Sequence, residues 1–356
     1  VAAFLRISLL STLPPGPHFD EAANILITRS IAFDGANLFP IANSYQGRES
    51  LYFYLNVPVF RLIGDDVFAL RIASVWINLL TIAAAMGLGR VMFRGQRGWL
   101  IGLAIGVMMT ISFHQIFMSR QAYRAVSLPL MQALGLLFLW RGLTASRRDW
   151  LWLALGGLFA GGAIYTYMAS RLFPLWLGIG GLVLLWADRA NWRLRLRQGG
   201  IFFGVMLLTM TPMLLYALEN PDIFFQRLDE VTEGEVSVSL LESIRLHLEM
   251  FFIRGDAGNL RYNDPGRPYF TVIEGVFLLV GVGIASWRLF QRGINPTQRA
   301  AYVLILLSPL MVIPSVISVA GFPPSHMRSL GMVPLIFVLV AVGFEAILGY
   351  MMRRLP

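Results

Sequence analysis

Long apolar stretches fill most of the sequence after residue 66. Nine of them approach the roughly 20 apolar residues that a membrane-crossing helix needs. They cover about residues 67–92, 98–117, 126–142, 150–169, 172–188, 200–218, 270–290, 300–320 and 329–352. Hydrophobic residues make up 56% of the chain and charged residues 14%, whereas soluble domains carry about 25% charged residues. The sequence therefore predicts an all-α polytopic membrane protein.

The apolar run Val1–Leu13 is too short to cross a bilayer. We interpret it as the outer end of a truncated first helix, which brings the expected bundle to about ten transmembrane helices. No stretch has the composition of a separate soluble domain, so residues 1–356 are expected to form one integral membrane domain. Because the chain has no cysteine, disulfides and thiolate metal sites are excluded.

Charge is distributed unevenly between the two sides of the predicted membrane. All 29 basic residues are arginine, and the net charge is +9. When the spans alternate, 15 arginines and two acids lie on one side, and the other 14 arginines and 18 acids occupy the rest of the chain. The arginine-rich side is cytoplasmic by the positive-inside rule. This topology accounts for the positive charge without a nucleic-acid partner, and it places two long loops, 14–66 and 219–269, outside.

Short helices are predicted inside both loops. The first covers Glu21–Phe33, with Asp20 as its N-cap and Gly35 just beyond its end. A second covers Leu51–Ile63 despite the internal Pro58. In the second loop, Ser239 and Glu242 have the spacing of a capping box before an amphipathic segment. The first two helices are expected to lie along the membrane surface, and the third either on the membrane or on the first loop.

The neighbouring carboxylates Asp20 and Glu21 are the first candidates for chemistry. They follow the end of a span by a few residues, where the headgroup of a lipid-linked substrate would lie. A carboxylate there can accept a proton from an acceptor hydroxyl. Adjacent helical residues point about 100° apart, so at most one of the pair can face a reacting centre. The commoner alternative is that Asp20 caps the helix and Glu21 complements its dipole.

A second group of candidates lies at the end of the first loop. Arg48 and Glu49 precede a run that contains Tyr52 and Tyr54. Glu49 can hold sugar hydroxyls, and the tyrosines can stack on a sugar ring or a polyprenyl chain. An ordinary loop followed by an aromatic belt at the membrane interface is the alternative.

Arginines at the outer ends of spans are candidates for binding a lipid phosphate. Arg120 and Arg124 follow one span, and Arg328 precedes another, with His326 close by in the run Pro324-Ser325-His326-Met327-Arg328. An arginine at membrane depth needs an anionic partner, and phosphate suits it. Snorkelling towards lipid headgroups is the alternative for each arginine.

The run GDAGNLRYNDPGRP in the second loop contains polar residues in a turn-rich sequence. Asp256 and Arg261 are substrate-binding candidates there. Together with Asn259, Asn263 and Asp264 they could be considered as metal ligands, but the run matches no calcium-loop pattern. The chain also has no Asp-x-Asp motif, and its four histidines are widely spaced. We expect no metal and no cofactor.

Four segments together carry a family resemblance. They read HFDEAANIL, GRESLYFYLNVPVF, FMSRQAYRAVSLPLM and PPSHMRSLGMVPL. In these the chain resembles the GT-C membrane glycosyltransferases, most closely the bacterial branch related to protein O-mannosyltransferases and to the transferase that adds aminoarabinose to lipid A. The resemblance covers nearly the whole chain. It implies an inverting enzyme that moves a sugar from a polyprenyl-phosphate donor to an acceptor protein, glycolipid or wall polymer.

The resemblance also implies roles and a location. Asp20 would be the catalytic base, Glu21 its motif partner and Glu49 a second loop carboxylate, while Arg120 and Arg328 would contact the donor phosphate. The enzyme would lie in a bacterial cytoplasmic membrane, with membrane lipid around it and its site facing outward. A secondary transporter would instead carry ionisable residues near mid-span, of which the spans have few. A non-catalytic subunit that binds lipid and carbohydrate is the third reading.

Overall fold

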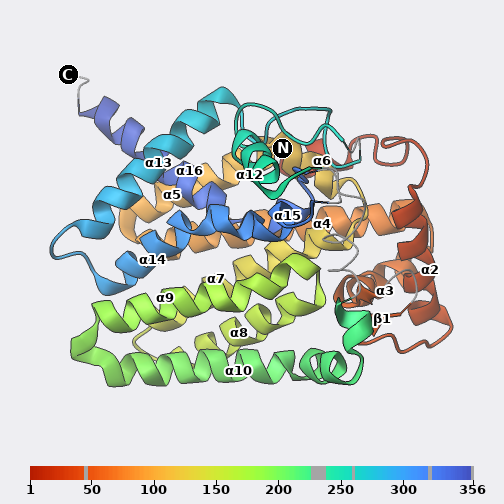
Figure 1. Cartoon of the computed structure of the whole chain (residues 1–356), viewed down its shortest axis with the longest axis horizontal. Coiled ribbons are helices and arrows are strands. Elements are labelled where there is room, and N and C mark those ends of the chain that lie inside the picture. The colour runs from red at the N-terminus through yellow and green to blue at the C-terminus, as the bar shows by residue number, and fades with distance from the viewer. Residues whose placement is uncertain (44–46, 226–237, 259–260, 320–322, 354–356) are drawn as a thin grey trace.

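The computed structural model describes residues 1–43, 47–225, 238–258, 261–319 and 323–353. The described chain is a bundle of helices with one short antiparallel ladder, in which β1 (Ile41–Ala42) pairs with β2 (Arg48–Glu49) (Figure 1). The α-helices are α1 (Ala2–Ile7), α2 (Phe19–Phe33), α3 (Leu51–Ile63), α4 (Val67–Phe93), α5 (Gly95–Ile111), α6 (Phe113–Ser119), α7 (Ser127–Thr144), α8 (Asp149–Gly162), α9 (Phe173–Ala187), α10 (Trp192–Glu219), α12 (Leu240–Glu249), α13 (Val272–Phe290), α14 (Pro296–Leu306), α15 (Ile313–Val316) and α16 (Leu335–Met352).

Seven helical segments in the described residues are long and apolar enough to cross a membrane. They are Val67–Phe93, Arg124–Thr144, Met168–Ala187, Arg189–Glu219, Val272–Phe290, Pro296–Val316 and Leu335–Met352. The pair α5 and α6, bent by 62°, would make an eighth. The prediction of an all-α multi-pass membrane protein is confirmed. The expected count of ten spans is not, because the segment 150–169 forms the 14-residue α8 and a 3₁₀ turn, Ala163–Tyr165.

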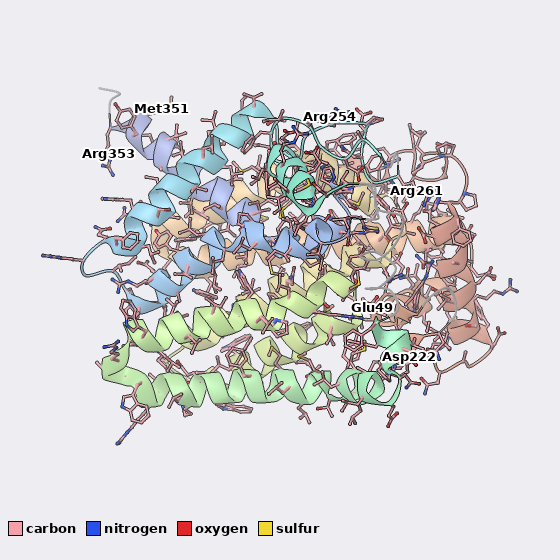
Figure 2. All side chains as sticks on the ribbon, in the orientation of Figure 1. Glu49, Asp222, Arg254, Arg261, Met351 and Arg353 are labelled. Atoms are coloured by element: carbon pink, nitrogen blue, oxygen red, sulfur yellow. The ribbon has the colours of Figure 1, made fainter. Side chains whose placement is uncertain are left out.

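The two ends of the bundle differ in what they carry. The long helices run along the longest axis of the molecule, and α2, α3 and the β1–β2 ladder lie together at one end, which we call the loop end (Figure 1). Glu49 and Arg261 also lie at this end, whereas Arg353 lies at the opposite, arginine end (Figure 2). At the arginine end, Arg195 pairs with Asp188 at 2.7 Å and Arg97 pairs with Glu345 at 3.0 Å.

Helices α2 and α3 form the loop end because each has one apolar side. In α2, Ala23, Ile27 and Ile31 are four residues apart and buried, as a helix with one face on a core requires. In α3, Phe53 and Phe60 are buried and Pro58 is accommodated within the helix. Both predicted loop helices are therefore confirmed. For the capping box in α12, the Ser239 hydroxyl accepts the Glu242 N–H at 3.2 Å, while the Glu242 side chain pairs with Arg245.

Glycines allow the long helices to approach one another closely. A Cβ added at Gly161 of α8 would lie 2.5 Å from the carbonyl oxygen of Met206 in α10. A Cβ at Gly281 of α13 would collide with the carbonyl of Leu339 in α16. Small residues of this kind let helix backbones pack tightly where lipid provides no hydrophobic driving force. Gly161 and Gly281 are therefore helix-packing residues.

Candidate active site

The start of α2 positions the two neighbouring carboxylates. His18, and not Asp20, is the N-cap: its Nδ1 accepts the Asp20 N–H at 3.1 Å, and the Glu21 carboxylate accepts the His18 N–H at 3.0 Å. The prediction of Asp20 as N-cap was wrong. Glu21 completes a reciprocal capping box with His18, so the Asp20 side chain is not needed for the helix start.

Glu21 is enclosed between α2 and α4. Its carboxylate receives two hydrogen bonds from Arg71 of α4, both at 2.8 Å, and a third from the Ala122 N–H at 3.2 Å. Only 2% of the Glu21 side chain and 3% of the Arg71 side chain are exposed. Arg71 also donates to the carbonyls of Pro14 and Gly16, each at 2.7 Å. Glu21 therefore holds the chain before α2 against α4, and its oxygens are turned away from solvent.

Asp20 faces a small cleft at the loop end. Its side chain is 27% exposed, and one carboxylate oxygen accepts a hydrogen bond from Arg48 at 2.9 Å. The other oxygen lies 3.8 Å from a nitrogen of Arg261. The cleft is lined by Asp20, Asn24, Arg48, Tyr123, Arg124, Ala125, Tyr167, Tyr262 and Met327. Of the two neighbouring carboxylates, Asp20 is thus the one available to a ligand.

Arg48 is fixed so that it can hold Asp20. The β1–β2 ladder places Arg48 opposite Ala42, and the buried guanidinium donates to Asn24 at 2.8 Å as well as to Asp20. Asn24 in turn donates to the carbonyl of Ala122 at 2.7 Å. The sequence analysis missed Asn24, although it lies four residues after Asp20 and therefore on the same helix face.

The second predicted loop carboxylate, Glu49, does not line the cleft itself but pairs with Arg124, which does. The Arg124 Nε donates to Glu49 at 3.0 Å, and both side chains are buried. The Arg124 guanidinium also lies 5.6 Å from the ring centre of Tyr167. The sequence predicted Glu49 and Arg124 as separate ligand contacts. The structure joins them in one ion pair, of which Arg124 lines the cleft.

The aromatic residues of the cleft are not those expected. Tyr52 is fully buried, with its hydroxyl 2.7 Å from that of Ser74 in α4. Tyr54 donates to Asn37 at 3.1 Å. Tyr52 is thus enclosed by protein and Tyr54 is half-buried, and neither is among the residues that line this cleft.

Tyr123, Tyr167 and Tyr262 line the cleft instead. The Tyr123 and Tyr262 rings meet edge to face with their centres 5.6 Å apart. Burial raises the pKa of Tyr262 to about 12, so its phenol stays protonated at neutral pH and can donate a hydrogen bond.

The remaining candidates occupy different environments. Arg120 donates to the carbonyls of Leu5, Arg6, Ser8 and Leu13, which ties the N-terminal segment to the end of α6. Asp256 is buried beneath the loop, and its backbone carbonyl accepts from Asn263 at 3.0 Å. Asn259 lies outside the described residues. Arg120 and Asp256 therefore contact other parts of the protein, whereas Arg261 is half-exposed and approaches Asp20.

His326 and Arg328 follow each other closely but point into different surroundings. His326 is fully buried, 4.9 Å from the ring centre of His114 and 5.4 Å from that of Tyr269. Burial lowers the pKa of His326 to about 3, so it is neutral at physiological pH. Arg328 is half-buried, and across the part of the chain that the structure describes its guanidinium forms no ion pair. Arg328 is therefore available to an anionic ligand, whereas His326 is enclosed.

Among the residues that the structure describes, no three His, Asp or Glu side chains are grouped as metal ligands would be. The ionisable side chains that line the cleft are a carboxylate, two guanidiniums and three phenols. This set can accept a proton at Asp20, neutralise an anion at the arginines and cover a sugar ring with aromatic surface.

Comparison with solved structures adds the fold relationship. The chain superposes on ArnT from Cupriavidus metallidurans in the apo state with a TM-score of 0.60 and 18% identity, covering 93% of this chain and 55% of that one. It superposes on the archaeal oligosaccharyltransferase AglB from Archaeoglobus fulgidus with a TM-score of 0.62 and 13% identity, covering 99% and 50%. In fold, the chain resembles the GT-C membrane transferases.

The resemblance inferred from the sequence motifs is thus confirmed at the level of fold. A second ArnT structure, bound to undecaprenyl phosphate, matches with a TM-score of 0.52 and 18% identity over 96% of this chain and 75% of that one. The chain spans about half the length of apo ArnT and of AglB. No family model matches the sequence, and no curated protein matches it.

Proposed function

We propose that the chain is an inverting glycosyltransferase that moves a sugar from a polyprenyl-phosphate donor to an acceptor hydroxyl or amine. The observation that supports this most strongly is the placement of Asp20. Its carboxylate lies in the cleft, partly exposed, held by Arg48 and surrounded by arginines and phenols. A base, nearby cations and aromatic surface are what sugar transfer from a lipid phosphate needs.

In the proposed step, the acceptor atom attacks the anomeric carbon of the sugar. A bond forms between the acceptor and that carbon, while the bond from the carbon to the phosphate oxygen breaks. Asp20 takes the acceptor proton, and the electron pair of the broken bond leaves with the lipid phosphate. Arg48 orients the Asp20 carboxylate through the hydrogen bond at 2.9 Å.

The leaving phosphate would be received by the arginines of the cleft. Arg124 lines it, Arg261 approaches Asp20, and Arg328 follows the lining residue Met327. An arginine beside the departing phosphate stabilises the charge that develops there. Solved structures show ArnT bound to undecaprenyl phosphate and AglB in complex with an inhibitory peptide and a dolichol-phosphate, which supports a donor of this class.

The proposed enzyme acts on the outer side of the membrane. The arginine end carries Arg353 and lies opposite the cleft (Figure 2). By the positive-inside rule that end is cytoplasmic, so the cleft faces outward. A donor flipped to the outer leaflet would present its phosphate at the depth of the loop end.

The test is sugar transfer from a panel of radiolabelled polyprenyl-phosphate sugars in membranes that contain the full chain. Asp20→Asn should lower transfer by about 10²–10⁴-fold, the usual contribution of a general base. Asp34→Asn is the matched control, because Asp34 is an exposed carboxylate at the other end of the same helix. It should leave the rate unchanged.

Two results would contradict the proposal in different ways. An active, correctly inserted Asp20→Asn variant would remove Asp20 from the role of base while leaving the transferase activity in place. The absence of transfer from every donor, in protein shown to be folded, would favour a transporter or a non-catalytic lipid-carbohydrate subunit.

A further inference from the structure

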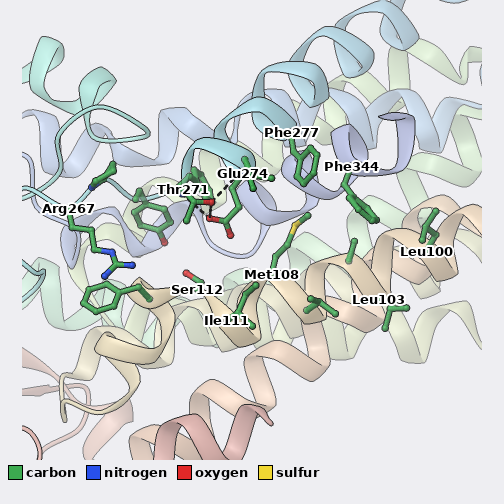
Figure 3. Close-up of a pocket in the computed structure, with 17 residues that line it drawn as sticks. Leu100, Leu103, Met108, Ile111, Ser112, Arg267, Thr271, Glu274, Phe277 and Phe344 are labelled. Atoms are coloured by element: carbon green, nitrogen blue, oxygen red, sulfur yellow. Dashed lines mark hydrogen bonds between the residues drawn. The ribbon is translucent and has the colours of Figure 1, made fainter. Parts of the chain in front are cut away.

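A second concave surface lies along the membrane-facing side of the bundle. It is a groove between α5, α13 and α16, with a volume of about 520 Å³, which is within the usual range for ligand pockets (Figure 3). Its walls are formed by Leu103, Val107 and Ile111 of α5, Phe277 of α13 and Phe344 of α16. These walls are almost entirely apolar, so the groove suits a hydrocarbon chain.

The groove is separate from the cleft around Asp20. The two sets of lining residues have no member in common. Tyr269 lines the groove and packs against His114 and His326, with ring centres 4.3 and 5.4 Å apart. Met327, the residue after His326, lines the cleft. A layer of buried aromatic rings therefore stands between the two concave surfaces.

The length of the groove matches one leaflet of a bilayer. Along α5 it extends from Leu100 to Ser112 (Figure 3). At about 1.5 Å per residue, this stretch is about 18 Å long. One leaflet contributes about 15 Å of hydrocarbon. The acyl chain of an ordinary membrane lipid fits that length, whereas a much longer polyprenyl chain would extend beyond it.

An arginine, Arg267, lies at the end of the groove nearer the loop end. Arg267 lies at the opposite end of the groove from Leu100 (Figure 3). Its side chain is exposed, and its guanidinium carbon lies 3.9 Å from the centre of the Phe113 ring. In the described residues, no carboxylate pairs with it. The nearby Glu274 instead caps α13, where its carboxylate accepts the Thr271 N–H at 2.9 Å and the Thr271 hydroxyl at 2.8 Å. A lipid phosphate at Arg267 would supply the missing counter-charge.

We propose that this groove binds an anionic glycerophospholipid, with an acyl chain along α5 and the phosphate at Arg267. The site is independent of the proposed transfer reaction. The bound lipid would hold the segment before α13 against α6, because Arg267 lies over Phe113 of that helix.

The experiment is native mass spectrometry of the purified full chain titrated with phosphatidylglycerol or phosphatidylcholine. One phosphatidylglycerol should bind more tightly than phosphatidylcholine. Arg267→Gln should weaken phosphatidylglycerol about fivefold, the effect of one arginine near an anionic headgroup, and should weaken phosphatidylcholine less, because the choline cation offsets the charge of its phosphate. Arg254→Gln is the matched control, because Arg254 is an exposed arginine nearby that does not line the groove. It should bind both lipids like the wild type.

A second pair of variants tests the apolar part. Leu103→Trp should block the groove and remove tight binding of both lipids, whereas Leu208→Trp, at an exposed position on α10, should not. Equal binding of the two lipids by the wild type, or equal effects of the two arginine variants, would overturn the assignment. Displacement of phosphatidylglycerol by an equimolar amount of polyprenyl phosphate would assign the groove to a polyprenyl chain and would also overturn it.

Discussion

Asp20 and Glu21 are neighbours in sequence but belong to two different regions of the molecule. Glu21 lies in the joint between α2 and α4, with 2% of its side chain exposed and four hydrogen bonds to its carboxylate. Asp20 lies in the cleft, with 27% exposed and one oxygen near the half-exposed Arg261. The joint keeps its charges inside the protein, whereas the cleft leaves Asp20 and Arg261 accessible. One helix start therefore supplies both a structural ion pair and a reactive carboxylate.

The largest expected effect comes from breaking the joint. Glu21→Gln would leave Arg71 buried without its counter-charge, which typically costs about 3–5 kcal/mol. Asp20→Asn should cost less, about 1–2 kcal/mol, because the Asp20 side chain is 27% exposed and asparagine keeps an oxygen that can accept from Arg48. Reversible unfolding of the two variants in mixed micelles measures the difference. Equal losses of stability would show that the two carboxylates are not divided between structure and chemistry.

The second prediction concerns a buried group that stays neutral. Burial holds the pKa of His326 at about 3 in the folded chain, below the value of about 6.5 expected when unfolded. The unfolded chain therefore binds more protons between these values, and stability falls as the pH falls through this window. At pH 5 the loss from this residue should be about 2 kcal/mol.

His326→Phe is the variant that isolates this contribution. It keeps a ring of similar size against His114 and Tyr269 but cannot take up a proton. Unfolding measured from pH 7 to pH 5 should show a smaller loss of stability in the variant than in the wild type. Parallel pH profiles would mean that His326 is protonated, or hydrated, in the folded protein.

The sequence was sufficient for features set by local spacing. Apolar length predicted the membrane helices, and end signals at Asp20 and Gly35 predicted α2, in which Ala23, Ile27 and Ile31 follow the helix period in the structure. The cleft could not be predicted in this way, because it is formed by contacts between segments that are distant in the sequence. Glu21 is held by Arg71, 50 positions later, and Arg124 by Glu49, 75 positions earlier. No local pattern reveals which of two adjacent carboxylates has a buried partner.

The aromatic residues show the same limit. Tyr52 and Tyr54 stand beside the charged pair Arg48 and Glu49 in sequence, which favoured them as substrate contacts. Their orientation on α3 depends on what that helix covers, and Tyr52 faces Ser74 of α4. Tyr262 comes from a turn-rich segment with no periodic pattern, so only the fold could bring it to Asp20.

The third prediction separates two arginines that the sequence treated alike. Arg328→Gln should raise the KM for the donor about tenfold, because the variant loses one charged contact to the phosphate. Arg120→Gln should instead lower stability by about 1–3 kcal/mol, since four backbone carbonyls would lose their donor. Its KM should stay near the wild-type value. Initial rates over a range of donor concentrations distinguish the two, and an unchanged KM in Arg328→Gln would remove Arg328 from the phosphate site.

The smallest effect is expected at Arg48, which positions the base without reacting. Its guanidinium contacts Asp20 at 2.9 Å and Asn24 at 2.8 Å through different nitrogens. A lysine has the same charge but only one nitrogen, so it cannot reproduce both contacts in this geometry. Arg48→Lys should lower kcat about threefold to tenfold and leave the KM for the donor nearly unchanged, because the positive charge beside Asp20 is kept but its carboxylate is less well oriented.

Arg261→Lys provides the control for that change, because Arg261 is half-exposed and approaches Asp20 only to 3.8 Å. It should keep most of the wild-type kcat. If Arg261→Lys lost as much kcat as Arg48→Lys, the exposed cation would matter as much as the buried one. The activity of Asp20 would then depend on the positive charge around it, and not on the orientation of Arg48 by Asn24. In that case the cleft and the joint would differ only in their access to solvent.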